Sequence, residues 1–110
     1  MANEFVARNG IISLGGTTFP LTQIGTTYTV QPTDYFVEVT GGTFTISLPT
    51  AVGISGQSYE IKNSGSGVVV VDANGSQTID GVITKTLNQY GSLFITSNGA
   101  NWIIGGANGS

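Results

Sequence analysis

The sequence has 110 residues, of which 39% are hydrophobic and only 8% are charged. This length fits a single domain with its own core, and the hydrophobic fraction excludes a purely disordered linker. Three basic residues against six acidic ones give a net charge of −3, which argues against nucleic acid and against a polybasic membrane patch as partners.

The first 27 residues combine large apolar side chains with glycines. The stretch is too apolar for a solvated tail, but its glycines divide it into pieces too short for the core of a sheet. We therefore expect an extended N-terminal arm over residues 1–27 that anchors the chain on a partner. An edge strand folded onto the same domain is the alternative. The candidate anchoring residues are Phe5, Val6, Arg8, Ile11, Ile12, Leu14 and Phe19.

Alternation with period two dominates from residue 28 onward and predicts strands. Phe44, Ile46 and Leu48 fall on one face, with hydroxyl side chains between them. Residues 35–39 form a similar stripe, with Tyr35, Val37 and Val39 on one face. The glycines at 41 and 42 lie between these two runs and predict a tight hairpin connection.

The second half of the chain continues this pattern. Tyr59 and Ile61 should face away from Glu60, and residues 92–96 should form a hairpin with residues 102–104. Turn signals recur about every 8 to 12 residues, as in sandwiches and barrels. We expect an all-β fold: a small antiparallel β-sandwich or barrel-like module over residues 28–106, with at least six strands and a short tail at 107–110. No sustained 3.6-residue period predicts a helix.

Few residues are suited to catalysis. Histidine and cysteine, the usual general base and thiol nucleophile, are absent. Asp72 and Asp80 flank a turn and offer a glycosidase pair, but turn carboxylates more often cap the turn. Residues 72–83 begin like a calcium loop but place Gly75 at position 4 and Ile83 at position 12, where calcium loops need glycine at 6 and an acid at 12. We expect no enzymatic activity, no metal and no cofactor.

The large aromatic side chains are compatible with two roles. They can form a face that stacks against sugars, as in a carbohydrate-binding adhesin, or they can fill a core or an interface between subunits. No apolar run is long enough to span a bilayer, and no charged segment followed by an apolar one predicts a secretory signal. The candidate glycan or interface aromatics are Tyr28, Tyr35, Tyr59, Tyr90 and Trp102.

A series of short motifs resembles a β-rich module of bacteriophage tail fibres, tailspikes and head-decorating fibres. The Gln-Thr-Ile-Asp-Gly and Asn-Trp elements are the most specific of them, in this order and at these separations. The motifs are Tyr28-Thr29-Val30, Asp34-Tyr35, Ile46-Ser47-Leu48-Pro49, Tyr59-Glu60-Ile61-Lys62-Asn63, Gly67, Gly75-Ser76-Gln77-Thr78-Ile79-Asp80-Gly81, Tyr90-Gly91-Ser92 and Gly99-Ala100-Asn101-Trp102. Phe5-Val6-Ala7-Arg8-Asn9-Gly10 also resembles the opening of phage structural proteins.

The resemblance implies a homotrimer whose threefold axis runs along a fibre. A trimer would account for the low charged fraction, about a third of the roughly 25% of ordinary domains, because subunits would bury neutral surface between them. The expected role is a head fibre or capsid decoration on the virion surface, made in the host bacterial cytoplasm and docked on another virion protein. A short tail fibre or an adhesin that contacts a host surface glycan is the alternative.

Overall fold

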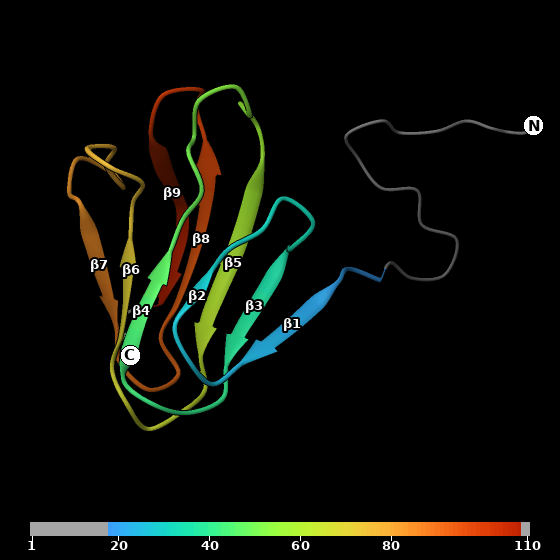
Figure 1. Ribbon diagram of the computed structural model, residues 1–110, viewed down its shortest axis with the longest axis vertical. Helices are drawn as coiled ribbons and strands as arrows, with labels where there is room; N and C mark the ends of the chain where they lie inside the picture. Colours follow the sequence, from blue (N-terminus) through green and yellow to red (C-terminus); the bar gives the residue numbers. More distant parts are fainter. Residues whose placement is uncertain (1–17, 109–110) are drawn as a thin grey trace, which may run out of the picture.

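The computed structural model describes residues 18–108, which form nine strands in two sheets and no helix (Figure 1). The five-stranded sheet has the order β1 (Leu21–Ile24), β3 (Phe36–Val39), β5 (Ser58–Asn63), β8 (Ser92–Ser97) and β9 (Trp102–Asn108). The four-stranded sheet has the order β2 (Tyr28–Thr29), β4 (Phe44–Ser47), β6 (Val69–Asp72) and β7 (Thr84–Leu87). The expected all-β class is confirmed.

The chain passes from one sheet to the other at each of its first connections. β1, β3 and β5 therefore lie side by side in one sheet, and β2, β4 and β6 lie side by side in the other. All of these neighbours pair in parallel. The first six strands thus make three stacked coils, each with one strand per sheet. β7, β8 and β9 then add antiparallel pairs at the far edge of both sheets.

The hydrophobic core lies between the two sheets. Val37, Ile61 and Leu93 form one row across the five-stranded sheet, and Ile46 pairs with Val71 in the other. All five side chains are buried in one cluster. Alternation places the remaining side chains of these strands on the outer faces, so the period of two in the sequence translates directly into an inner and an outer surface.

Three expectations about pairing need correction. The sheets are mixed rather than antiparallel, and they stay open rather than closing into a barrel. The glycines at 41 and 42 do not close a hairpin, because β3 and β4 belong to different sheets. The turn is a corner of the coil, and Gly42 adopts a φ of 96° there. The expected hairpin of β8 and β9 is confirmed, and eight strands, β2 to β9, begin within residues 28–106.

The predicted arm overlaps with the sheet. β1 pairs with β3 from Leu21↔Phe36 to Ile24↔Val39, so the edge-strand alternative describes this part of the chain. Phe19 is also described, and it contacts Tyr35. The other candidate anchoring residues lie outside the described residues.

Polar side chains of the Gln77–Asp80 segment hold the connections in place. The Gln77 side chain accepts a hydrogen bond from the Ala51 amide at 2.9 Å and donates one to Thr50 Oγ1 at 2.8 Å. Asp80, with a φ of 49°, accepts a hydrogen bond from the Ile104 amide through Oδ1 at 3.1 Å. These side chains tie distant loops together. A structural role therefore accounts for the glutamine at 77 and the aspartate at 80.

Candidate functional site: the outer face of the five-stranded sheet

An apolar row crosses the outer face of the five-stranded sheet. The register places Leu21 beside Phe36 and Phe36 beside Glu60. Glu60 in turn pairs with Phe94, whose neighbour in β9 is Gly106. We call the outer surface formed by this row and the adjoining stacked rings the aromatic face. Its side chains are Phe19, Leu21, Tyr35, Phe36, Glu60 and Phe94.

One end of the aromatic face is a stacked pair of rings. Phe19 and Tyr35 lie with ring centroids 4.3 Å apart and planes tilted by 19°. Phe19 is 42% exposed and Leu21 is 57% exposed, so apolar surface faces outward at this end. Stacked rings at this separation attract each other beyond the area that they bury, which orders Phe19 just before β1 begins.

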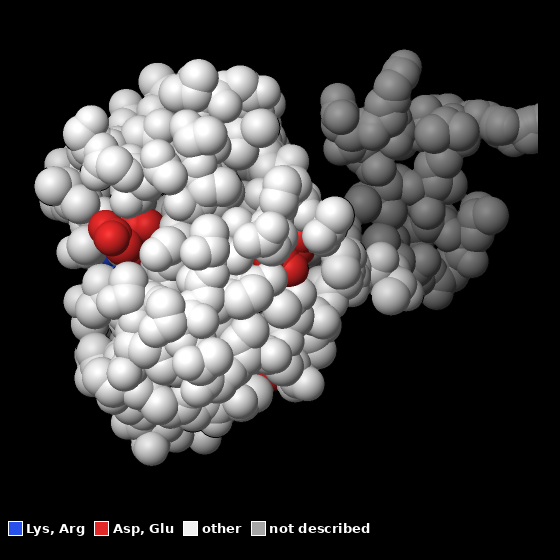
Figure 2. All heavy atoms as spheres, viewed as in Figure 1, with Lys and Arg blue, Asp and Glu red and all other residues white. Residues whose placement is uncertain are grey.

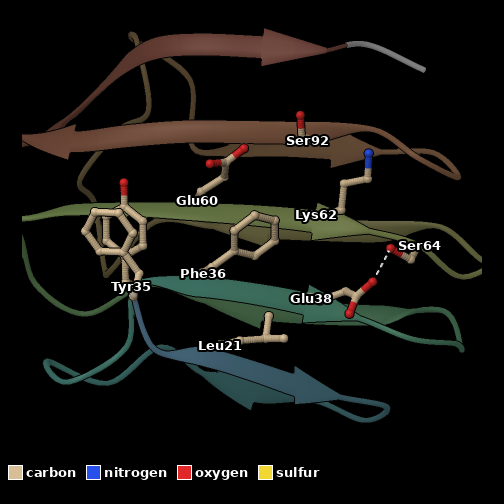
Figure 3. A pocket seen from close by; sticks show the side chains of 9 residues that line it. Leu21, Tyr35, Phe36, Glu38, Glu60, Lys62, Ser64 and Ser92 are labelled. Carbon is tan, nitrogen blue, oxygen red and sulfur yellow. Dashed lines mark hydrogen bonds between the residues drawn. The ribbon is translucent and has the colours of Figure 1, made fainter. Parts of the chain in front are cut away.

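A second row of polar side chains borders the apolar one. Gln23, Glu38, Lys62 and Ser92 are neighbours across β1, β3, β5 and β8. Glu38 accepts a hydrogen bond from Gln23 Nε2 at 2.8 Å. It accepts another from Ser64 Oγ at 2.6 Å, which Figure 3 shows. Hydrogen bonds from Gln23 and Ser64, together with the charge of Lys62, lower the pKa of Glu38 below its ordinary value. Glu38 is therefore ionised and already has partners.

Glu60 differs from Glu38 in this respect. Among the described residues, its carboxylate makes no hydrogen bond or ion pair. Its side chain is half-buried and lies in the row between Phe36 and Phe94. Lys62 lies two residues further along β5, and its Nζ is 5.8 Å from the ring centroid of Tyr90. Glu60 and Lys62 thus lie on the same face of one strand, and neither forms an ion pair with another described residue.

These side chains surround two shallow depressions that share the Phe19–Tyr35 pair. The first, of about 570 Å³, extends over Leu21, Phe36 and the charged side chains of β3 and β5 (Figure 3). The second, of about 660 Å³, extends toward Phe94 and the loop before β5. Together they hollow much of the outer face of the five-stranded sheet.

The five aromatic residues singled out in the sequence do not share one surface. Tyr59 and Trp102 are fully buried, with ring centroids 5.6 Å apart, so neither offers a ring to a sugar. Tyr28 is half-buried and donates a hydrogen bond to Asp34, while Tyr90 is 56% exposed. Of the five, only Tyr35 belongs to the aromatic face.

Phe36, Phe94 and Leu21 are not among the site residues predicted from the sequence. A signal for Phe94 was present, because Leu93, Phe94 and Ile95 are consecutive apolar residues in a strand. Such a run predicts apolar side chains on both faces, as in strands that are covered on both sides. Phe36 falls in a similar position between Tyr35 and Val37.

The described residues hold no cluster of three side chains suited to binding a metal ion. None of the described elements is an apolar helix of the length needed to cross a membrane. The two carboxylates considered as a glycosidase pair have different surroundings. Asp72 faces outward from β6, whereas Asp80 accepts a hydrogen bond from the Ile104 amide. No protein-family model matches the chain, and no curated protein matches it in sequence.

Proposed function

We propose that this chain is a non-enzymatic structural protein of the bacteriophage virion. In this role it is a trimeric, fibre-like capsid decoration or head fibre, attached to another virion protein through its N-terminal residues. The observation that carries the proposal is a stack of parallel coils whose five-stranded sheet turns a row of large apolar side chains outward, with Leu21 57% exposed. A contiguous exposed apolar row of this kind is suited to burial against other chains.

The distribution of charge supports the same proposal. Most of the surface in Figure 2 carries neither acidic nor basic side chains. The described residues include two lysines, Lys62 and Lys85, and no arginine. A surface with so few charges is suited to burial between subunits, where charged residues are depleted from the centre of an interface.

Two measurements test the proposal. Sedimentation of the full chain at micromolar concentration should give about three times the mass of one 11.3 kDa chain. Electron microscopy of intact particles with this protein labelled should place it on the virion surface. A monomer in the first experiment, or absence from particles in the second, would contradict the proposal.

A short tail fibre or adhesin that binds a host surface glycan is the second candidate. The observation in its favour is the depression of about 660 Å³, where Phe19 and Tyr35 lie beside Gln57 and two serines, Ser55 and Ser58. Rings with neighbouring hydroxyl and amide groups are suited to sugars. Saturable binding of surface glycans that is lost in Tyr35→Ala, but kept in the exposed control Tyr90→Ala, would favour this candidate.

A further inference from the structure

The outer faces of the two sheets have different chemistry. On the four-stranded sheet, alternation turns one set of residues outward, and six of these seven side chains are polar. They are Thr29, Thr45, Ser47, Val70, Asp72, Thr84 and Thr86. On the five-stranded sheet the corresponding central row holds Leu21, Phe36 and Phe94. The four-stranded sheet thus turns an almost wholly polar face to solvent, whereas the five-stranded sheet turns outward an apolar row, interrupted by Glu60, beside a polar one.

The charges in and beside the aromatic face indicate which kind of partner fits it. Glu60 has no hydrogen-bond or ion-pair partner among the described residues, whereas the nearby Lys62 lies over the Tyr90 ring and also acts on Glu38 through its charge. A purely acidic partner would face Glu60 and Glu38, and a purely basic one would face Lys62. A second copy of the same chain brings one free acid and one base to the same surface, so each charge can meet its opposite.

We propose that the aromatic face is the contact surface between copies of this chain, with Lys62 of one copy next to Glu60 of its neighbour. This inference rests on the proposed trimer and specifies its interface. The apolar side chains of the row form the centre of the contact, and the ion pair fixes the register of one copy on the next. The polar face of the four-stranded sheet remains in contact with solvent.

The β9 end of the row allows close approach by a neighbouring chain. Gly105 and Gly106 of β9 carry no side chains, and a Cβ added at Gly105 would lie 3.0 Å from Cδ2 of Phe94. The Phe94 ring therefore lies over the glycines of β9, and no side chain from these two glycines projects beyond it. A neighbour can approach the row closely from there.

Charge exchange tests the inference on the full chain. Glu60→Lys alone and Lys62→Glu alone each place like charges opposite one another across the contact. Each should raise the concentration at which half of the protein is trimeric by at least about tenfold. The double variant Glu60→Lys/Lys62→Glu restores opposite charges and should return this concentration to within about threefold of the wild type.

Matched controls separate the interface from general effects. Asp72→Lys makes the same charge change as Glu60→Lys on the polar face and should leave assembly unchanged. For the apolar contact, Leu21→Ser should weaken assembly. Ile83→Ser should not, because Ile83 is similarly exposed, at 54%, but lies outside the aromatic face.

Other outcomes overturn the inference in distinguishable ways. A wild type that is trimeric, with single charge variants that assemble equally well, would place the interface elsewhere and leave the proposed trimer standing. A monomeric wild type would overturn both. Hydroxyl-radical labelling of Phe36 and Phe94 should increase on dilution. Low labelling of these rings at a dilution where sedimentation shows a monomer would mean that the chain itself covers the face, which contradicts a contact between copies.

Discussion

A single buried carboxylate organises the first coil at the residue scale. Asp34 is 8% exposed and accepts three hydrogen bonds, from Thr22 Oγ1 at 2.7 Å, Tyr28 Oη at 2.6 Å and the Gln31 amide at 2.8 Å. These donors come from β1, β2 and the turn that follows, so one side chain links both strands of the coil. The same contact raises the pKa of Tyr28 to about 12, through its hydrogen bond to Asp34, its burial and the negative charge.

Replacing Asp34 with asparagine should therefore destabilise the fold. The amide keeps one acceptor oxygen, but its nitrogen would face a hydroxyl or amide donor and leave that donor unpaired. We expect Asp34→Asn to lower the free energy of unfolding by about 1–3 kcal/mol, measured by urea denaturation. Asp72→Asn is the control, because Asp72 lies on the polar outer face, and it should change stability by less than about 0.5 kcal/mol. Equal effects of the two variants would contradict this role for Asp34.

Stability should also depend on pH through Asp34. Burial favours a higher pKa for this carboxyl, but the hydrogen bonds from Tyr28, Gln31 and Thr22 outweigh it and lower the pKa below its ordinary 3.8. A lowered pKa in the folded state means that the stabilisation is present above pH 3.8 and is lost as the pH falls through the folded value. The difference in unfolding free energy between wild type and Asp34→Asn should shrink as urea titrations move from pH 6 toward pH 2. A difference that stays constant would show that the charge of Asp34 is not its source.

At the scale of elements, close contact between coil corners sets how the coils stack. A Cβ added at Gly65 would lie 2.6 Å from Cα of Gly41, and one added at Gly67 would collide with the Gly42 carbonyl oxygen. The loop before β6 therefore packs directly on the backbone of the corner between β3 and β4. Only glycine permits this approach, because any larger side chain would push the two corners apart.

Gly67→Ala should consequently weaken the stack. The added methyl group meets backbone atoms, which cannot rotate away, and we expect a loss of about 1–3 kcal/mol in unfolding free energy. Gly41→Ala is a control from the same corner, since a Cβ there meets no atom within 4 Å. Thermal or urea unfolding that ranks Gly41→Ala as the more damaging change would contradict this account of the corner.

The sequence predicts the strands better than it predicts their partners. Alternation identified the inward faces of β4 and β5, because a period of two fixes which side chains share a face. The alternation pattern does not indicate which strands are neighbours in a sheet. A pair of glycines, as at 41 and 42, is compatible with a hairpin turn or with a corner between two sheets. The coil repeat was also hidden by unequal spacing: Phe36 follows its partner Leu21 by 15 residues, and Glu60 follows Phe36 by 24. Glu60 emerged as a candidate contact only when β3 and β8 placed a phenyl ring on either side of it.

At the scale of the whole molecule, each sheet ends in a parallel strand of the first coil. β1 ends the five-stranded sheet and β2 ends the four-stranded one, and within residues 18–108 no further strand pairs with either edge. Unprotected edges readily pair with other chains, and natural proteins cover or shorten them. The proposed anchoring role of the N-terminal residues and the integrity of this first coil therefore have to be tested separately.

Two deletions separate anchoring from folding. Removing residues 2–17 leaves β1 and the Phe19–Tyr35 stack in place, so the urea midpoint and the trimeric mass should match those of the full chain, while incorporation into virions should fail. Removing residues 2–25 also deletes β1, with the Thr22–Asp34 hydrogen bond and the contact of Ile24 with the core. This second deletion should lower the unfolding free energy by at least about 1.5 kcal/mol, because apolar surface and the edge of β3 become exposed. Normal loading of the shorter deletion onto particles would place the attachment in the β-domain itself. Equal stability of the two deletions would mean that β1 contributes nothing to the fold.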